Sequence, residues 1–149
     1  MPGQPRWTPL DMAESPHSNW SATRFFDLLP KLGRLRVISV CGPSVFEAIC
    51  EAGSYTVERG SINMVTAEFH WHFAPARLSF LQSHDTVHAR SGRRVLFFTL
   101  HEREDEAPFL RIYVYRRPNE EFDAAAADVF RTAHEDLASG VVVRAEESL

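Results

Sequence analysis

Residues 60–73 read GSINMVTAEFHWHF, and this segment combines the pattern of a β-strand with side chains that bind metal ions. From Glu68 to Phe73, polar and aromatic residues alternate. Because alternate residues of a strand lie on opposite faces, we expect Glu68, His70 and His72 on one face and the aromatic side chains on the other. The α-carbons of the two histidines are then roughly 7 Å apart, which is close enough for both imidazoles to contact one ligand. The alternative is that both histidines are half-exposed sheet residues without a ligand.

The composition predicts a soluble protein that does not insert into a membrane. The chain has 149 residues, of which 44% are hydrophobic and 24% are charged, close to the average of globular domains. No apolar run approaches the 18 or so residues of a membrane span. The net charge of −4 argues against a general affinity for nucleic acid, which needs an excess of basic residues. Lys31 is the only lysine among 16 basic residues, so chemistry that needs a lysine amine has a single candidate.

The N-terminal residues and the two cysteines bear on organisation and location. Four prolines fall within the first 17 residues, so we expect residues 1–17 to form a flexible arm and residues 18–149 to form one α+β domain. The arm contains no apolar signal segment. Cys41 and Cys50 lie nine residues apart in a predicted hairpin, which suits a reducing compartment better than a disulfide framework. We therefore expect a cytoplasmic protein.

Hydrophobic periodicity and turn residues predict antiparallel β-sheets with a short N-terminal helix and a long C-terminal helix. Ser18 or Ser21 caps the first helix, which ends at Pro30. Asn119 caps the second helix, expected from about residue 120 to residue 138, with Phe130 on its apolar stripe. Residues 83–92 have the composition of a loop. About seven strands are expected in between, at residues 34–40, 45–50, 55–58, within 60–73, and at 77–82, 94–101 and 109–116, and residues 141–143 suit a short edge strand. The strands 94–101 and 109–116 should be antiparallel neighbours.

Five short motifs occur in an order that is similar to a known family. They are LPKLG at 29–33, PSVFEA at 43–48, GSINM at 60–64, FHWHF at 69–73 and LRIYVYRR at 110–117. The order resembles the cytosolic haem-carrier proteins of bacterial haem-utilisation operons, the HutX/ChuX type, and more distantly each half of the HemS/ChuS-type haem-trafficking proteins. The resemblance covers about residues 25–135 and implies an α+β fold, a homodimer, and haem held at a sheet surface as cargo for iron transport. It implies haem transfer and not catalysis.

One departure from that family concerns the iron ligand. A tyrosine that ligates haem in some of these carriers is replaced here by Ser61 and Ile62. A dimeric relative that has lost haem binding is therefore an alternative. A second alternative is a small haem-degrading or metal-dependent, cupin-like enzyme, with Glu68, His70 and His72 on a bare metal. The sequence shows no dedicated acid–base constellation, so we expect a non-enzymatic protein.

The candidate haem site combines an iron ligand with cations and an aromatic side chain. Neutral imidazole is a common axial ligand of haem iron, so His70 or His72 is the expected ligand. Haem also needs an apolar wall for the macrocycle and cations for its propionates. The expected cofactor-binding residues are His70, His72, Arg93, Arg94, Arg111 and Tyr113.

Overall fold

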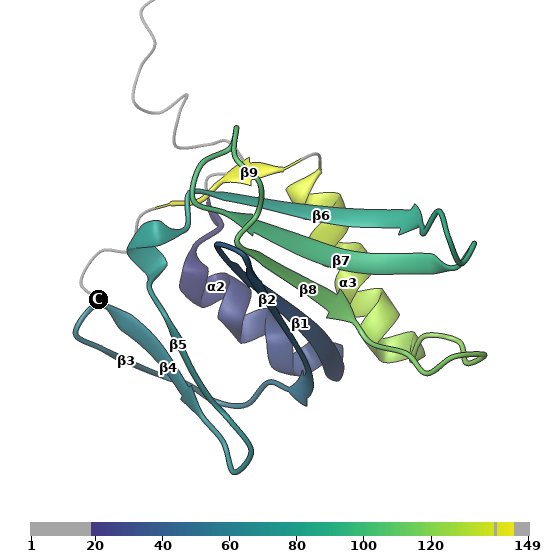
Figure 1. Ribbon diagram of the computed structural model, residues 1–149, viewed down its shortest axis with the longest axis horizontal. Helices are drawn as coiled ribbons and strands as arrows, with labels where there is room; N and C mark the ends of the chain where they lie inside the picture. The colour runs from purple at the N-terminus through teal and green to yellow at the C-terminus, as the bar shows by residue number, and fades with distance from the viewer. Residues whose placement is uncertain (1–18, 139, 145–149) are drawn as a thin grey trace, which may run out of the picture.

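The computed structural model describes residues 19–138 and 140–144, and Figure 1 shows the arrangement of its helices and strands. The helical elements are α2 (Ala22–Leu28), η2 (Leu29–Leu32), η3 (Pro75–Arg77) and α3 (Ala124–Leu137). The strands are β1 (Arg34–Cys41), β2 (Ser44–Glu51), β3 (Thr56–Glu58), β4 (Ser61–Val65), β5 (His70–Phe73), β6 (Phe80–Val87), β7 (Arg94–His101), β8 (Leu110–Val114) and β9 (Val141–Val142). The predicted arm at residues 1–17 lies outside the described residues. No helix in the described part of the chain is long and apolar enough to cross a membrane.

The strands form two antiparallel sheets, which confirms the predicted α+β class. The large sheet has six strands in the order β2-β1-β8-β7-β6-β9, and the small sheet has the order β3-β4-β5. Strands β7 and β8 pair antiparallel, with Phe98 opposite Ile112, as the sequence predicted. The β1–β2 hairpin closes at the predicted turn, where Cys41 pairs with Ser44.

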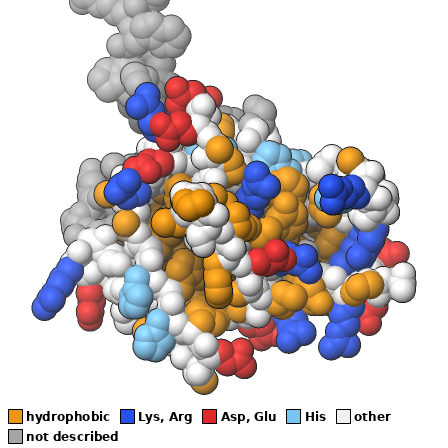
Figure 2. Space-filling model, viewed as in Figure 1, with side chains coloured by type: hydrophobic (Ala, Val, Ile, Leu, Met, Phe, Trp, Pro, Cys, Tyr) orange, Lys and Arg blue, Asp and Glu red, His pale blue; other side chains and the backbone are white. Residues whose placement is uncertain are grey.

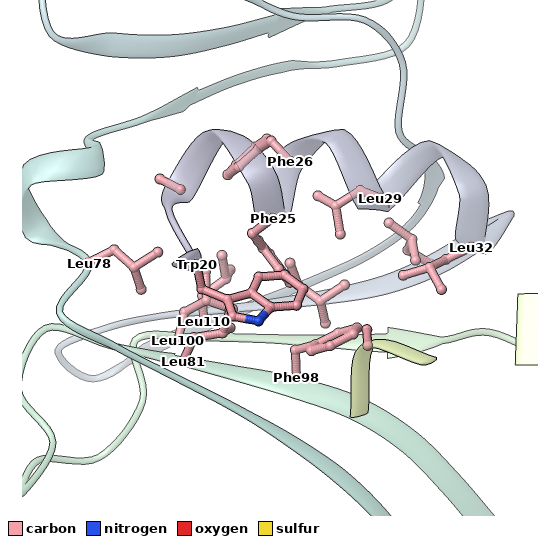
Figure 3. Close-up of a cluster of buried hydrophobic side chains, with 14 of the residues drawn as sticks. Trp20, Phe25, Phe26, Leu29, Leu32, Leu78, Leu81, Phe98, Leu100 and Leu110 are labelled. Carbon is pink, nitrogen blue, oxygen red and sulfur yellow. The ribbon is translucent and has the colours of Figure 1, made fainter. Parts of the chain in front are cut away.

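The core lies on both sides of α2, which is sandwiched between the two sheets (Figure 3). Phe25 points from this helix toward the large sheet, where its ring centroid lies 5.2 Å from that of Phe98. Phe26 points the opposite way, and its ring lies 5.0 Å from the rings of both Trp71 and Phe73 in the small sheet. Helix α3 packs beside η2 on the same face of the large sheet, because Phe130 also contacts Phe98 at 5.0 Å. Helix α2 therefore packs against both sheets, and the rings of Phe73 and Phe109, 6.0 Å apart, add a further contact to the small sheet.

The two helices begin at side-chain caps, one of them predicted and one not. The Ser21 hydroxyl accepts a hydrogen bond from the Arg24 backbone N–H at 3.2 Å, so the first cap is confirmed. The second helix begins later than predicted, because Asp123 accepts from the Ala126 N–H at 3.0 Å. Asn119 instead lies in a turn with a φ of 68°, a left-handed conformation that asparagine tolerates better than most residues.

Two segments differ from the sequence prediction in their strand boundaries. The segment 60–73 is a hairpin of β4 and β5, and Glu68 lies in the turn between them, so its expected place on the strand is wrong. The Thr66 hydroxyl fixes this turn by accepting hydrogen bonds from the N–H groups of Glu68 and Phe69, at 3.3 and 3.1 Å. The predicted loop at 83–92 is also wrong in its first half, because β6 continues to Val87 along β7. Cross-strand pairing outweighs the polar composition of that segment.

The large sheet has a second face that the described helices do not cover, here called the open face. Along β7 this face carries the side chains of Val95, Phe97 and Thr99, and their neighbours on β8 are Tyr113 and Arg111. Figure 2 shows hydrophobic side chains gathered across the middle of the visible surface, over the large sheet. At the two edges of the open face Val45 is 63% exposed and Val142 is 67% exposed. Apolar side chains thus lie at both edges and in the middle of this face, next to polar residues such as Thr99 and Arg111.

Candidate functional site

The two histidines of β5 lie together on the outer face of the small sheet. His70 and His72 are both exposed, and their ring centroids are 6.1 Å apart. Between and after them, Trp71 and Phe73 point inward onto Phe26 of α2. Figure 2 shows histidine side chains on the visible surface of this small sheet. The alternation of a histidine face and an aromatic core face is therefore present as predicted.

A neighbouring strand orients one of these imidazoles. His72 Nδ1 lies 2.7 Å from the side-chain oxygen of Asn63, its partner on β4. An amide oxygen only accepts hydrogen bonds, so Nδ1 carries a proton, and in a neutral imidazole the lone pair is then on Nε2. The amide of Asn63 is itself fixed, because its Nδ2 donates to the Ser61 backbone carbonyl at 3.2 Å. An oriented imidazole of this kind is typical of histidines that bind metals.

His70 instead lines an apolar cleft between the β1–β2 hairpin and the start of β5. The cleft has a volume of about 380 Å³. Its apolar wall includes Val37, Phe46, Phe69, Trp71 and Leu110. Phe46 is 70% exposed, unusually high for a phenylalanine on a strand. The cleft thus offers an imidazole next to solvent-facing apolar surface.

The polar lining of this cleft is sparse. Apart from His70, Glu68 is the only acidic or basic side chain among the described residues that line it. Cys50 also lines the cleft, and burial, followed by the nearby charge of Glu68, raises the pKa of its thiol. The thiol therefore stays protonated at neutral pH and is a poor nucleophile. The arrangement suits binding of an apolar ligand through His70 better than covalent chemistry.

The other four predicted site residues lie away from the histidines, on the large sheet. Arg94 forms a two-bond ion pair with Asp85, at 2.8 and 2.7 Å, which lowers the pKa of that carboxyl. Arg93, Arg94 and Tyr113 line a second cleft that shares no described residue with the first. Arg111 lies on the open face, opposite Thr99. Within one chain the structure therefore brings His70 and His72 together, and it places Arg93, Arg94, Arg111 and Tyr113 elsewhere.

Two features bear on the bare-metal alternative and on what sequence reasoning missed. No group of three or more His, Cys, Asp or Glu side chains suited to a metal ion occurs in the described part of the chain. Glu68, His70 and His72 thus do not form a three-ligand site.

Sequence reasoning missed the role of Asn63, because its pairing with His72 depends on the register of β4 against β5. It also missed Phe46 as a wall of the cleft.

This chain resembles known proteins in its three-dimensional structure. No protein-family model and no curated protein sequence matches this chain. The structure of the haem-binding protein ChuX superposes with a TM-score of 0.65 and 13% sequence identity, covering 78% of this chain and 72% of ChuX. This chain has the ChuX fold. The structure of protein AGR_C_4470 from Agrobacterium tumefaciens superposes on this chain with a TM-score of 0.64 and 19% identity, over 77% of this chain and 67% of that protein.

The ChuX fold also matches part of a larger haem-binding protein. Holo-PhuS from Pseudomonas aeruginosa superposes with a TM-score of 0.61 and 13% identity over 73% of this chain. The match covers only 31% of PhuS, so this chain corresponds to about a third of that protein. At these identities the comparisons establish the fold.

Proposed function

We propose that this chain is a non-enzymatic haem-binding protein that carries haem for transfer, with His70 as the iron ligand and His72 as the alternative. The observation that carries the proposal is that His70, whose side chain is exposed, is one of the residues that line a solvent-facing apolar cleft. Two proteins that share the fold, ChuX and PhuS, are haem-binding proteins. Neutral imidazole is a common axial ligand of haem iron.

The residues of the cleft fit the chemistry of a partly exposed porphyrin. Phe46, Phe69 and Trp71 offer apolar and aromatic surface, and the cleft volume of about 380 Å³ lies in the range of small-molecule sites. Because no arginine or lysine occurs in the described lining, the propionates of a bound haem would point toward solvent. A cofactor held by one imidazole and an open apolar wall is accessible to a receiving protein, which suits transfer. The bound iron would supply the coordination site, and the chain supplies the ligand and the wall.

The open face supports a homodimer. Val45 and Val142 are both more than half exposed, and partly buried apolar side chains such as Val40 and Phe80 lie between them. Exposed apolar surface of this extent is typical of a protein–protein interface. A second copy would present the same surface, so the contact would be symmetric. We also propose a cytoplasmic location, because Cys41 and Cys50 are free thiols, as expected in a reducing compartment.

Hemin titration of single-site variants tests the proposed ligand. If His70 ligates iron, His70→Ala should lose the shifted Soret band, whereas His72→Ala and Asn63→Ala should keep it. If His72 is the ligand, His72→Ala should lose the band, and Asn63→Ala should weaken binding by roughly tenfold because the imidazole is no longer oriented. His88→Ala, on an exposed loop, is the matched control. If His70→Ala and His72→Ala both titrate like the unmodified protein and like the His88→Ala control, ligation by either residue is refuted.

Position 61 offers a complementary test. The Ser61 side chain lies on the same outer face as Asn63 and His72, whereas Ile62 is fully buried. We therefore expect Ser61→Tyr, and not Ile62→Tyr, to add a tyrosinate ligand with a new high-spin hemin spectrum. The same new spectrum from Ile62→Tyr alone would contradict this assignment of faces.

A further inference from the structure

A second cleft lies on the large sheet, where β7 begins and β8 ends. Its volume is about 350 Å³. The side chains that matter for its chemistry are Arg36, Arg93, Arg94, Arg116, Tyr113 and Tyr115. Four arginines are therefore among the residues that line a space of that size, whereas the apolar cleft next to His70 has none in its described lining.

Two of these four arginines are neutralised by carboxylates. Arg36 forms an ion pair with Glu47 at 3.0 Å, and Glu47 is the only acidic side chain in the described lining. Arg94 is held by both oxygens of Asp85. These two pairs leave little net charge at their positions.

The other two arginines are held only by neutral groups. Arg116 donates to the Arg94 backbone carbonyl at 2.7 Å, and its guanidinium lies 4.1 Å above the ring of Phe122. Arg93 donates to the Arg117 backbone carbonyl at 3.3 Å. No described carboxylate lies within ion-pair distance of Arg93 or Arg116. Each guanidinium has five N–H donors, so both keep donors and a full positive charge next to the cleft.

Further donors border the same space. Tyr113 and Tyr115 also line the cleft, and neither hydroxyl group forms a hydrogen bond with the described part of the chain. The ring of Tyr113 is held in place by stacking on Phe97, with centroids 4.6 Å apart. Planar, immobilised guanidinium groups with hydroxyl donors are the groups that recognise phosphate and carboxylate oxygens.

We propose that this cleft binds a small doubly charged oxyanion, a phosphate or a dicarboxylate, through Arg93 and Arg116. The pair supplies two uncompensated positive charges, and the two tyrosine hydroxyls supply neutral donors. The site is separate from the apolar cleft and does not depend on haem binding. Arg36 and Arg94 position the wall through their own ion pairs and contribute little to the charge.

Calorimetric titration at constant ionic strength tests this site, with inorganic phosphate in one arm and succinate in the other. We expect saturable binding of at least one anion, and the tighter of the two identifies the ligand chemistry as phosphate or dicarboxylate. Arg93→Gln and Arg116→Gln should each weaken binding by roughly tenfold or more, since each removes charge-assisted hydrogen bonds. Arg103→Gln, in an exposed loop outside the cleft, should leave the affinity unchanged.

Two results would overturn the proposal. One is the absence of saturable binding for both phosphate and succinate. The other is binding that Arg93→Gln and Arg116→Gln leave as tight as in the unmodified protein, since the anion would then lie elsewhere. Circular dichroism of each variant checks the fold. Arg93→Gln keeps the test valid if Arg116→Gln unfolds, because among the described residues the Arg93 side chain makes one long hydrogen bond, to a backbone carbonyl.

Discussion

Replacing Phe26 by alanine should loosen the attachment of the small sheet to α2. The side chain is fully buried, and its ring lies 5.0 Å from Trp71, 5.0 Å from Phe73 and 6.0 Å from Tyr55. These three rings come from the small sheet and from the segment that leads into it. The substitution therefore removes the centre of the contact that supports the histidine strand.

The expected cost follows from burial and ring contacts. Truncating a buried phenylalanine to alanine costs about 3–5 kcal/mol, and aromatic pairs add about 0.5–1.5 kcal/mol each beyond the area they bury. Because Phe26 has three ring partners, we expect Phe26→Ala to lower the free energy of unfolding by about 4–5 kcal/mol. A domain of this kind has a free energy of unfolding of about 5–15 kcal/mol, so the variant should be marginally stable.

The assay is equilibrium unfolding in urea followed by far-UV circular dichroism. Phe46→Ala is the matched control, because Phe46 is 70% exposed and its truncation should change the free energy of unfolding by no more than about 0.5–1 kcal/mol. The same control should nonetheless weaken hemin binding, since Phe46 lines the apolar cleft. A loss below about 1.5 kcal/mol for Phe26→Ala, or a loss equal to that of Phe46→Ala, would refute the reasoning.

Three further predictions concern α3, pH and assembly. Phe130→Ala should cost about 3–5 kcal/mol in urea unfolding, because Phe130 is only 1% exposed; a loss below about 1 kcal/mol would contradict its burial. Burial and then the charge of His101 lower the pKa of His84, so the unfolded chain takes up the proton first and stability should fall as the pH drops below about 6.5. His84→Gln should make the free energy of unfolding less dependent on pH below about 6.5, and identical pH profiles for both proteins would count against this contribution. Light scattering at micromolar concentration should give a dimer mass that Val45→Arg reduces to a monomer mass, and a monomer mass for the unmodified chain would exclude the homodimer.

Local pattern was enough to predict most elements of the fold. The alternation from Phe69 to Phe73 predicted which side chains of β5 face the core, because strand periodicity depends only on neighbouring residues. The stripe that contains Phe130 predicted the long helix for the same reason. The hairpin turn after Val65 was missed, because the side chain of Thr66 replaces the usual glycine or proline signal there.

The candidate site was less predictable, because it depends on contacts between distant segments. Asn63 orients His72 only through the register of two strands, and Phe46 meets His70 across a gap of more than 20 residues in sequence. Arg93 and Arg94 were grouped with the histidines by residue type alone. The order of strands in the large sheet places them at a different cleft.

A hemin titration that compares the unmodified chain with the His70→Ala/His72→Ala double variant tests the central claim most directly. The two side chains are exposed, so the double variant should keep its fold, which circular dichroism would confirm. We predict a saturable, shifted Soret band for the unmodified chain and its loss in the double variant, with His88→Ala behaving as the unmodified chain does. Identical titrations of the unmodified chain and the double variant would show that both histidines are structural and would contradict the proposed haem site.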